Sequence, residues 1–191
     1  MAQIKHFECK PEVYEPAEDT FLLLKAALAE AKPIDSVLEI GCGKGLICRR
    51  IAPNVRAILA TDINPHAVKI ARESGVSTVR ADLFKGLKAK FDMIIFNPPY
   101  LPTSDEERID GWLNFALDGG QSGRETIKRF LEELEGHLAP GGRALLLISS
   151  LTGLREIEDM AAATGWRFAW VASEKHFFEE LRVLKLYKRR E

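Results

Sequence analysis

Short apolar runs alternate with amphipathic helical patterns along most of the chain. The runs are rich in β-branched residues and predict strands, whereas the segments between them repeat apolar residues every three or four positions and predict helices. This alternation is typical of a doubly wound α/β fold, in which helices cover a mostly parallel sheet. The expected strands are residues 36–40, 55–61, 76–80, 91–96, 144–148, 167–173 and 181–187.

The helical segments lie between these strands. Phe21, Leu24 and Leu28 line one face of a first helix, which Pro16 opens at its first turn. The last two strands have too short a connection for a crossover helix, so we expect them to pair antiparallel. The other expected helices end near residue 52, run from Pro65 to near Gly75, and span 124–138 and 154–164, and Pro140-Gly141-Gly142 predicts a turn before the fifth strand.

One strand ends in a feature that predicts chemistry. Residues 91–96 are almost wholly apolar, as expected for a central strand that is buried on both faces. Asn97-Pro98-Pro99-Tyr100 ends this strand abruptly, because prolines cannot continue it. The polar, irregular stretch 101–123 follows and predicts a loop or lid beside the strand ends.

A glycine-rich turn after the first strand predicts a nucleotide-like cofactor. Gly41, Gly43 and Gly45 lie where the strand turns into a helix, and missing side chains let a ligand approach the backbone. Leu46 stands where a dinucleotide-binding fingerprint needs its last glycine, and Gly45 follows Lys44 where a P-loop needs Ser or Thr, so neither pattern fits.

Acidic residues follow the next two strands. Asp62 comes about 20 residues after the glycines, where a carboxylate can accept both hydroxyls of a ribose. Asp82 could accept an adenine amino group while the Leu83 backbone N–H meets a ring nitrogen. The plainer alternative is a tight turn at the glycines, with Asp62 and Asp82 as cap or turn residues.

The tetrapeptide at 97–100 predicts a binding site for a planar NH2 group. Two prolines remove two N–H donors and fix the backbone, which leaves the Pro98 carbonyl as a rigid acceptor. The Asn97 side-chain oxygen is a second acceptor, and together they can hold both hydrogens of an amide or aromatic amine. Tyr100 would stack on or wall the planar group. A purely structural turn is the alternative reading.

Together these motifs resemble the class I S-adenosylmethionine-dependent methyltransferases that modify amino nitrogens. The resemblance rests on Glu39 with the three glycines, on Asp62 and Asp82, and on the tetrapeptide 97–100, and it extends over essentially the whole chain. It implies a Rossmann-like, seven-stranded sheet with an antiparallel last strand. The expected organisation is one methyltransferase domain over 1–191, with an N-terminal segment and helix in 1–32 and the catalytic sheet in 33–191.

A narrower resemblance comes from Tyr14-Glu15-Pro16-Ala17-Glu18-Asp19-Thr20-Phe21. This stretch is similar to the opening motif of the archaeal and eukaryotic HemK-like release-factor glutamine methyltransferases, and Gly119-Gly120 with Gly123-Arg124-Glu125 resembles a later segment of that family. The resemblance implies that Thr20 touches the methionine end of the cofactor and Glu39 its amino group. It also implies contacts from Asp62 to the ribose, and from Asp82 and Leu83 to the adenine.

The resemblance also implies a reaction and a partner. The family methylates N5 of the glutamine in the Gly-Gly-Gln motif of a class I peptide release factor, and its members work with a small zinc-binding activator protein. Neither the acceptor nor the partner follows from motif spacing. Gly119-Gly120-Gln121 spells the substrate motif within this chain, which we interpret as coincidence.

Composition weighs against the alternatives. The rival enzyme is an N6-adenine methyltransferase, but no recognition domain follows Tyr100, and 27 basic against 28 acidic residues give no excess for binding phosphates. The basic tail with Lys185, Lys188, Arg189 and Arg190 is the best counterargument. A non-catalytic cofactor-binding scaffold is the third possibility, and the intact tetrapeptide argues against it.

Cysteine and histidine usage predicts a reduced protein without a metal site. Cys9, Cys42 and Cys48 are odd in number and form no C-x-x-C pair, and His6, His66, His137 and His176 are scattered. The first ten residues show no signal-peptide pattern, and no apolar run approaches the roughly 18 residues of a membrane span. We therefore expect a cytoplasmic protein.

Overall fold

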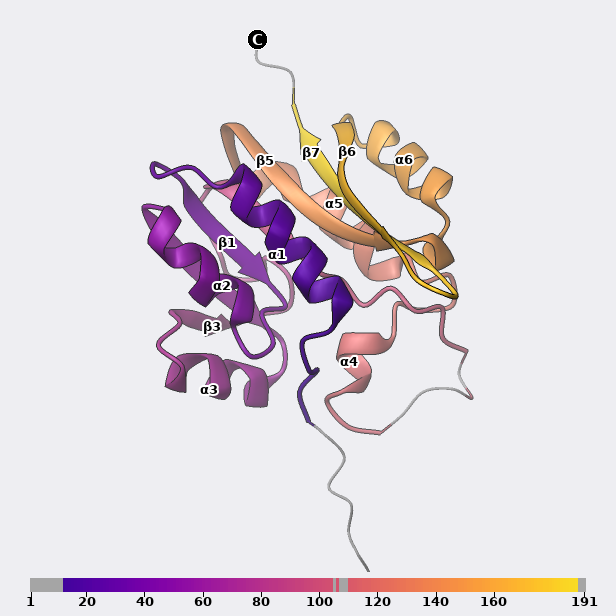
Figure 1. Cartoon of the computed structure of the whole chain (residues 1–191), viewed down its shortest axis with the longest axis horizontal. Coiled ribbons are helices and arrows are strands. Elements are labelled where there is room, and N and C mark those ends of the chain that lie inside the picture. Colours follow the sequence, from indigo (N-terminus) through magenta and orange to yellow (C-terminus); the bar gives the residue numbers. More distant parts are fainter. Residues whose placement is uncertain (1–11, 105, 107–109, 189–191) are drawn as a thin grey trace, which may run out of the picture.

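The computed structural model describes residues 12–104, 106 and 110–188. His6, Cys9, Arg189 and Arg190 lie outside these described residues, as does the N-terminal stretch that was expected to carry no signal. The described part contains a seven-stranded sheet in the order β3-β2-β1-β4-β5-β7-β6 (Figure 1). Its strands are β1 (Ser36–Ile40), β2 (Ala57–Asp62), β3 (Thr78–Arg80), β4 (Phe91–Phe96), β5 (Leu138–Ser149), β6 (Arg167–Lys175) and β7 (Glu180–Tyr187).

The pairing confirms the expected α/β topology. Strands β3, β2, β1, β4 and β5 run parallel to one another, whereas β7 runs antiparallel to both β5 and β6. The carboxyl ends of the five parallel strands therefore meet at one edge of the sheet. Ligands of open α/β sheets bind in the crevice outside this edge.

Helices cover both faces of the sheet. The helices are α1 (Glu18–Glu30), α2 (Leu46–Ile51), α3 (Pro65–Glu73), α4 (Asn114–Leu117), α5 (Glu125–His137) and α6 (Leu154–Ala163), with short 3-10 turns at Ala52–Asn54 and Ser150–Thr152. One core joins α1 and α2 to β1, β4 and β5, and a second core joins α5 and α6 to the opposite face. In Figure 1, α1 to α3 lie in front of the sheet and α5 and α6 behind it. No helix within the described residues is long and apolar enough to cross a membrane.

The first helix turns a different face to the sheet than its apolar repeat suggests. Leu22, Leu23, Ala26 and Ala27 are buried, and all four belong to the core between α1 and the sheet. Of the expected stripe, Phe21 is 55% and Leu28 43% exposed on the outer side, whereas Leu24 is partly buried and packs against this core. Pro16 precedes the N-cap residue Ala17 and so lies before the first turn. Small alanines at 26 and 27 let the helix approach the strands closely, which explains why they form the inner face.

The fifth strand is longer than its apolar run. Pro140-Gly141-Gly142 lies inside β5 and not before it, and the pairing with β4 jumps from Phe91–Leu138 to Met93–Arg143. The prediction of a turn that starts the strand was therefore wrong. These residues form a bulge, where a Cβ on Gly142 would lie only 2.9 Å from the Ala139 carbonyl oxygen.

The other boundaries shift by a few residues at most. The second strand starts at Ala57 and not at Val55, because Val55 follows the 3-10 turn. The third strand keeps only Thr78–Arg80, since Val76 ends the turn after α3 and donates its backbone N–H to Ala71. The antiparallel pairing of the last two strands is confirmed.

Candidate active site

A cavity of about 740 Å³ lies at the carboxyl edge of the parallel strands. It brings together residues that are far apart in the chain, from the start of α1, the glycine turn, the ends of β2 and β4 and the segment after β3. Of the predicted site residues, Gly45 alone does not line it. Those that do are Thr20, Glu39, Gly41, Gly43, Asp62, Asp82, Leu83, Asn97, Pro98, Pro99 and Tyr100.

Gly43 and Gly45 of the turn have different structural roles. Gly43 has φ +52°, and a Cβ built there would meet nothing within 4 Å, so its open side faces space that a ligand can use. Gly45 has φ +72°, and a Cβ there would lie 3.0 Å from the Val76 side chain. Gly45 therefore lets the turn pack against the residue before β3, which explains why it stays outside the cavity.

Asp62, at the end of β2, ties the glycine turn in place. Its carboxylate accepts the backbone N–H of Gly43 at 2.8 Å and that of Asn64 at 2.9 Å. Each carboxylate oxygen has a second lone pair, so the group can still accept ligand hydroxyls. Burial raises the pKa of Asp62, and the two backbone donors oppose that rise.

Glu39 is a second buried carboxyl in the same wall. One of its oxygens accepts the backbone N–H of Cys48 in α2 at 2.9 Å. Burial raises its pKa to about 7, with a smaller contribution from the charge of Asp62. A cationic ligand group placed beside Glu39 would be stabilised by its ionised form, and would pull this pKa down again.

Asp82 and Leu83 form the far wall. The Asp82 carboxylate pairs with the Arg129 guanidinium of α5 at 2.8 Å, and both side chains are partly exposed. Leu83 has φ +49° and is the sole non-glycine residue with positive φ among the described residues. Such strained backbone is concentrated at ligand sites.

The amide of Asn97 is held in one orientation. Its Nδ2 donates to the Asp19 carboxylate at 2.9 Å, whereas its Oδ1 is buried and has no hydrogen-bond partner among the described residues. A buried acceptor without a donor costs free energy. The arrangement therefore leaves Oδ1 as an acceptor to which no donor of the described residues is bound.

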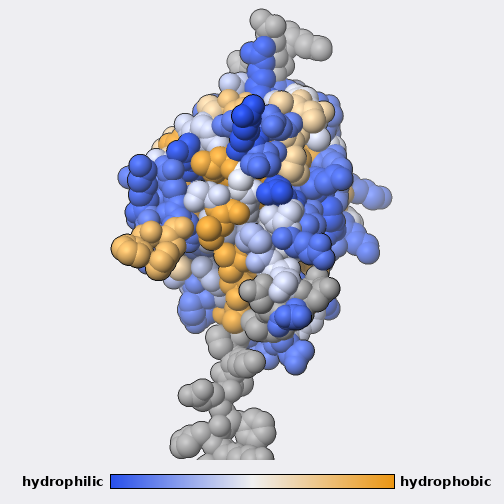
Figure 2. Space-filling model, turned by 90° about the vertical axis from the view of Figure 1, so that its right-hand side faces the viewer, coloured by the Kyte–Doolittle hydropathy of each residue, from blue (hydrophilic) through white to orange (hydrophobic). Residues whose placement is uncertain are grey.

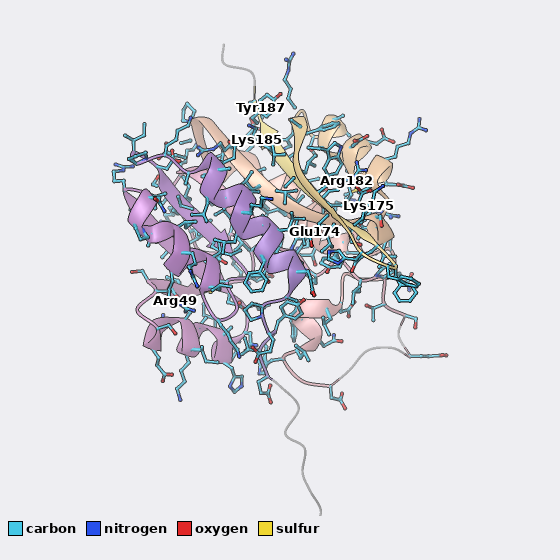
Figure 3. All side chains as sticks on the ribbon, in the orientation of Figure 1. Arg49, Glu174, Lys175, Arg182, Lys185 and Tyr187 are labelled. Carbon is cyan, nitrogen blue, oxygen red and sulfur yellow. The ribbon has the colours of Figure 1, made fainter. Side chains whose placement is uncertain are left out.

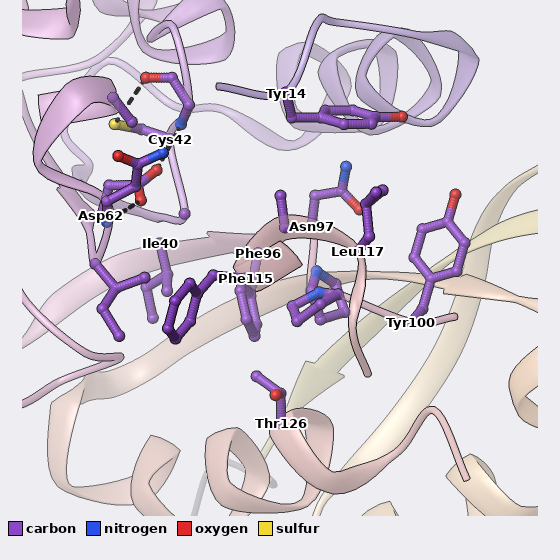
Figure 4. Close-up of a pocket in the computed structure, with 18 of the residues that line it drawn as sticks. Tyr14, Ile40, Cys42, Asp62, Phe96, Asn97, Tyr100, Phe115, Leu117 and Thr126 are labelled. Atoms are coloured by element: carbon purple, nitrogen blue, oxygen red, sulfur yellow. Dashed lines mark hydrogen bonds between the residues drawn. The ribbon is translucent and has the colours of Figure 1, made fainter. Parts of the chain in front are cut away.

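Asp19 is the centre of this arrangement. It is 4% exposed and also accepts the Tyr14 hydroxyl at 3.2 Å and the Thr20 hydroxyl at 3.1 Å. In Figure 4, Tyr14 lies above the Asn97 side chain and Tyr100 lies to its right. Burial, followed by the negative charge of Asp19, raises the pKa of both tyrosines far above the usual value, so both remain protonated.

The segment after the tetrapeptide forms part of the cavity wall, as expected of a lid. It contains the short helix α4, and Trp112, Phe115 and Leu117 line the cavity. Gly119 and Gly123 pack against the tetrapeptide, because a Cβ on Gly119 would lie 2.9 Å from the Pro99 carbonyl oxygen and one on Gly123 2.5 Å from that of Tyr100. Gly119 and Gly123 thus let this segment pack closely against the backbone of the tetrapeptide.

Two candidate functional residues, Asp19 and Arg129, could not be identified from the sequence. Asp19 lies in the motif 14–21, but only the fold shows that it contacts Asn97 across 78 positions of the chain. Arg129 looks like an ordinary polar position of α5 and lines the cavity beside Asp82. Among the described residues, no three His, Cys, Asp or Glu side chains are grouped as a metal ion would need.

A parallel sheet with a glycine turn after β1, an acid after β2 and Asn-Pro-Pro-Tyr after β4 defines a methyltransferase with a Rossmann-like fold. The family described as "Methyltransferase small domain" matches residues 17–111. A putative protein N5-glutamine methyltransferase of Methanocaldococcus jannaschii is 48% identical, over 93% of each chain. Human methyltransferase HEMK2 is 34% identical, over 93% of this chain and 90% of its own.

A solved structure agrees with these sequence relatives. The Mtq2–Trm112 complex of E. cuniculi, described as responsible for methylation of the eRF1 translation termination factor, superposes with a TM-score of 0.79 at 28% identity. The match covers 94% of this chain and all of that one. The chain belongs to the protein N5-glutamine methyltransferase family, which confirms the family inferred from its motifs.

Proposed function

We propose that this protein transfers a methyl group from S-adenosylmethionine to the side-chain nitrogen of a glutamine in a peptide release factor. The observation that carries the proposal is the buried, unpartnered Oδ1 of Asn97, a residue that lines the cavity of a glutamine methyltransferase fold. An acceptor in that position is suited to an incoming N–H donor. A primary amide, the group at the end of the glutamine side chain, offers two N–H donors.

The cavity fits S-adenosylmethionine at its other end. The open side of Gly43 leaves room for a ligand against backbone, and Asp62 retains lone pairs for ribose hydroxyls. Glu39 would take the methionine amino group, and Thr20 the methionine end. Asp82 and the Leu83 N–H would take the adenine, with Arg129 beside them. When bound, the cofactor would supply an electrophilic methyl group, its sulfur would keep the electron pair of the broken S–C bond as the demethylated product leaves, and the methylated nitrogen would lose one proton to solvent.

The residues of the tetrapeptide would orient the acceptor nitrogen and strengthen it as a nucleophile. An amide nitrogen is a poor nucleophile because its lone pair is delocalised into the carbonyl group. Asn97 Oδ1 and the Pro98 carbonyl would accept its two hydrogens, which stabilises the positive charge that develops on nitrogen. Tyr100 would pack against the planar amide. No general base is assigned, since this transfer depends mainly on positioning.

The partner proposed for this enzyme is a small activator protein that binds at β3. The Mtq2 relative is solved as a complex with Trm112. Strand β3 is at one edge of the sheet, and Val79 there is 42% exposed. An edge strand can accept a strand from another protein. A zinc-binding activator of the type implied by the family resemblance would fit this edge.

The test is methylation of a purified release factor. The chain and its activator are incubated with the factor and methyl-labelled cofactor, and the modified residue is identified by mass spectrometry. We expect one methyl group on the glutamine of the Gly-Gly-Gln motif. A release factor that stays unmodified, with a wild-type protein that binds the cofactor, would refute the proposal.

A further inference from the structure

Phe177 and Phe178 project from the turn between β6 and β7, where both side chains are almost fully exposed. Phe177 is 93% and Phe178 84% exposed, the highest values for large apolar side chains among the described residues. Their rings meet edge to face, with centroids 4.7 Å apart. Exposed turns normally carry Gly, Pro, Asn, Asp or Ser. Figure 2 shows apolar side chains that project from the flank of the molecule at this turn.

The turn is held firmly in place. The backbone N–H of His176 donates to the Glu179 carbonyl at 2.8 Å, which closes the turn. The Ser149 hydroxyl donates to the Glu179 carboxylate at 2.5 Å, and the Glu180 N–H donates to the Ser150 hydroxyl at 2.9 Å. These bonds attach the turn to the carboxyl end of β5. The phenylalanines are therefore presented on a preorganised support.

Charged side chains follow the strands behind the turn. Glu174, Lys175 and Arg182 lie along the hairpin (Figure 3), and Arg182 pairs with Glu180 at 2.8 Å. A polar surround of a small apolar centre is the usual layout of a protein-binding surface. The apolar centre here is confined to the two phenylalanines.

The turn lies beside the acceptor end of the cavity. A second hollow, of about 350 Å³, is lined by Phe177 and Phe178. It shares four wall residues with the main cavity, namely Tyr14, Asp19, Tyr100 and Glu179. The shared wall includes Asp19, which holds Asn97, and Tyr100 of the tetrapeptide. The second hollow therefore opens from the acceptor end and not from the glycine turn.

We infer that this second hollow binds the polypeptide that flanks the acceptor glutamine, with Phe177 and Phe178 packed against an apolar side chain of the substrate protein. The inference rests on the proposed function. A glutamine that reaches Asn97 brings its own backbone to the rim of the cavity, and an extended chain advances about 3.3 Å per residue. Residues that neighbour the glutamine in the substrate chain would then lie over the hollow and its turn.

The experiment compares methylation kinetics at saturating cofactor. The double variant Phe177→Ser/Phe178→Ser is measured with purified release factor and activator beside Ile34→Ser, a control that removes another exposed apolar side chain, 76% exposed, from the loop before β1. We expect KM for the release factor to rise about tenfold or more in the double variant, with kcat changed less than twofold, as for the loss of a binding hot spot. Ile34→Ser should match the wild type.

Two further measurements make the outcome decisive. Calorimetry should give the double variant the wild-type affinity for S-adenosylmethionine, which shows that it is folded. Phe178→p-benzoylphenylalanine should crosslink under light to the release factor, within a few residues of its methylated glutamine. An unchanged KM in the double variant, or a crosslink to the activator, would overturn the inference. A wild-type protein that does not methylate the release factor would instead overturn the proposed function.

Discussion

At the residue scale, Asn97 and Asp62 line one cavity but are proposed to contact different ligands, so their loss should have separable effects. We expect Asn97→Ala to lower kcat about a hundredfold or more and to leave cofactor affinity nearly intact, because its Oδ1 acts on the acceptor nitrogen. Asp62→Ala should weaken cofactor binding by about 1 to 3 kcal/mol, since ribose hydroxyls would lose their acceptor. Calorimetry and steady-state kinetics on both variants measure the two effects. Equal losses in affinity and rate for Asn97→Ala would make Asn97 a structural residue.

Asp19 is a positioning residue, and its effect should depend on Asn97. Asp19→Ala removes the acceptor for Asn97 Nδ2, so the amide is no longer held in one orientation. We expect kcat to fall at least about tenfold, with partial recovery in Asp19→Asn, which keeps one acceptor oxygen. The double variant Asp19→Ala/Asn97→Ala should be no slower than Asn97→Ala alone. Additive losses in this cycle would show that Asp19 acts independently of Asn97.

Glu39 should make stability depend on pH in a defined window. Burial raises its pKa to about 7 in the folded protein, against 4.5 for an exposed carboxyl. Because the folded state holds the proton more tightly, the stabilising contribution is fully present below pH 4.5 and is lost as pH rises through 7. Urea denaturation at several pH values should show that Glu39→Gln, which keeps an acceptor for the Cys48 N–H, reduces this decline in the free energy of unfolding. Parallel pH profiles for the two proteins would contradict the assignment.

At the scale of elements, sequence periodicity predicts the type and order of strands and helices, because a parallel sheet needs apolar runs and amphipathic helices in alternation. It could not predict the bulge of β5. Pro140-Gly141-Gly142 consists of typical turn residues, and only the pairing of β5 with β4 shows that they lie inside a strand. Periodicity could not choose the inner face of α1 either, because apolar residues occur on both sides of that helix. Such choices depend on the packing partner, which is distant in the chain.

The same limit applies to the site. The glycine turn and the tetrapeptide are contiguous motifs, so each could be found from local spacing. Asp19 and Arg129 are brought to the cavity from α1 and α5 by the fold alone. A contact between residues that lie 78 positions apart leaves no trace in the local sequence of either one. The pattern of charged residues along the sequence could not reveal this contact either.

The edge strand β3 gives a prediction at this scale. We expect Val79→Lys to abolish copurification with the activator, because a charge would have to be buried when another strand covers this edge. Leu28→Lys is the matched control, since Leu28 is 43% exposed on α1 and Val79 is 42% exposed on β3. Both variants should keep the wild-type cofactor affinity. A complex that survives Val79→Lys and is lost in Leu28→Lys would move the interface to α1.

At the scale of the whole molecule, the two cores place helices on both faces of the sheet and leave its carboxyl edge open. The cofactor end and the acceptor end of the cavity meet at β4, where the tetrapeptide ends the strand. Motifs from five separate segments converge there because parallel strands bring their carboxyl ends together. The second hollow adjoins the acceptor end of the cavity and not the glycine turn, so substrate and cofactor would enter from different sides.

The acceptor itself is decided at this scale, because glutamine and adenine both present a planar NH2 to Asn97. The chain has one basic residue fewer than it has acidic residues, which leaves no excess for phosphate contacts, and its Methanocaldococcus jannaschii relative is named a putative protein N5-glutamine methyltransferase. We expect a release factor to gain one methyl group in the presence of the activator and its Gln→Ala variant to gain none. DNA and RNA oligonucleotides that contain adenine should stay unmodified under the same conditions and should not compete with the release factor. Efficient methylation of adenine, with the release factor unmodified, would reassign the acceptor and leave the fold and the cofactor site unchanged.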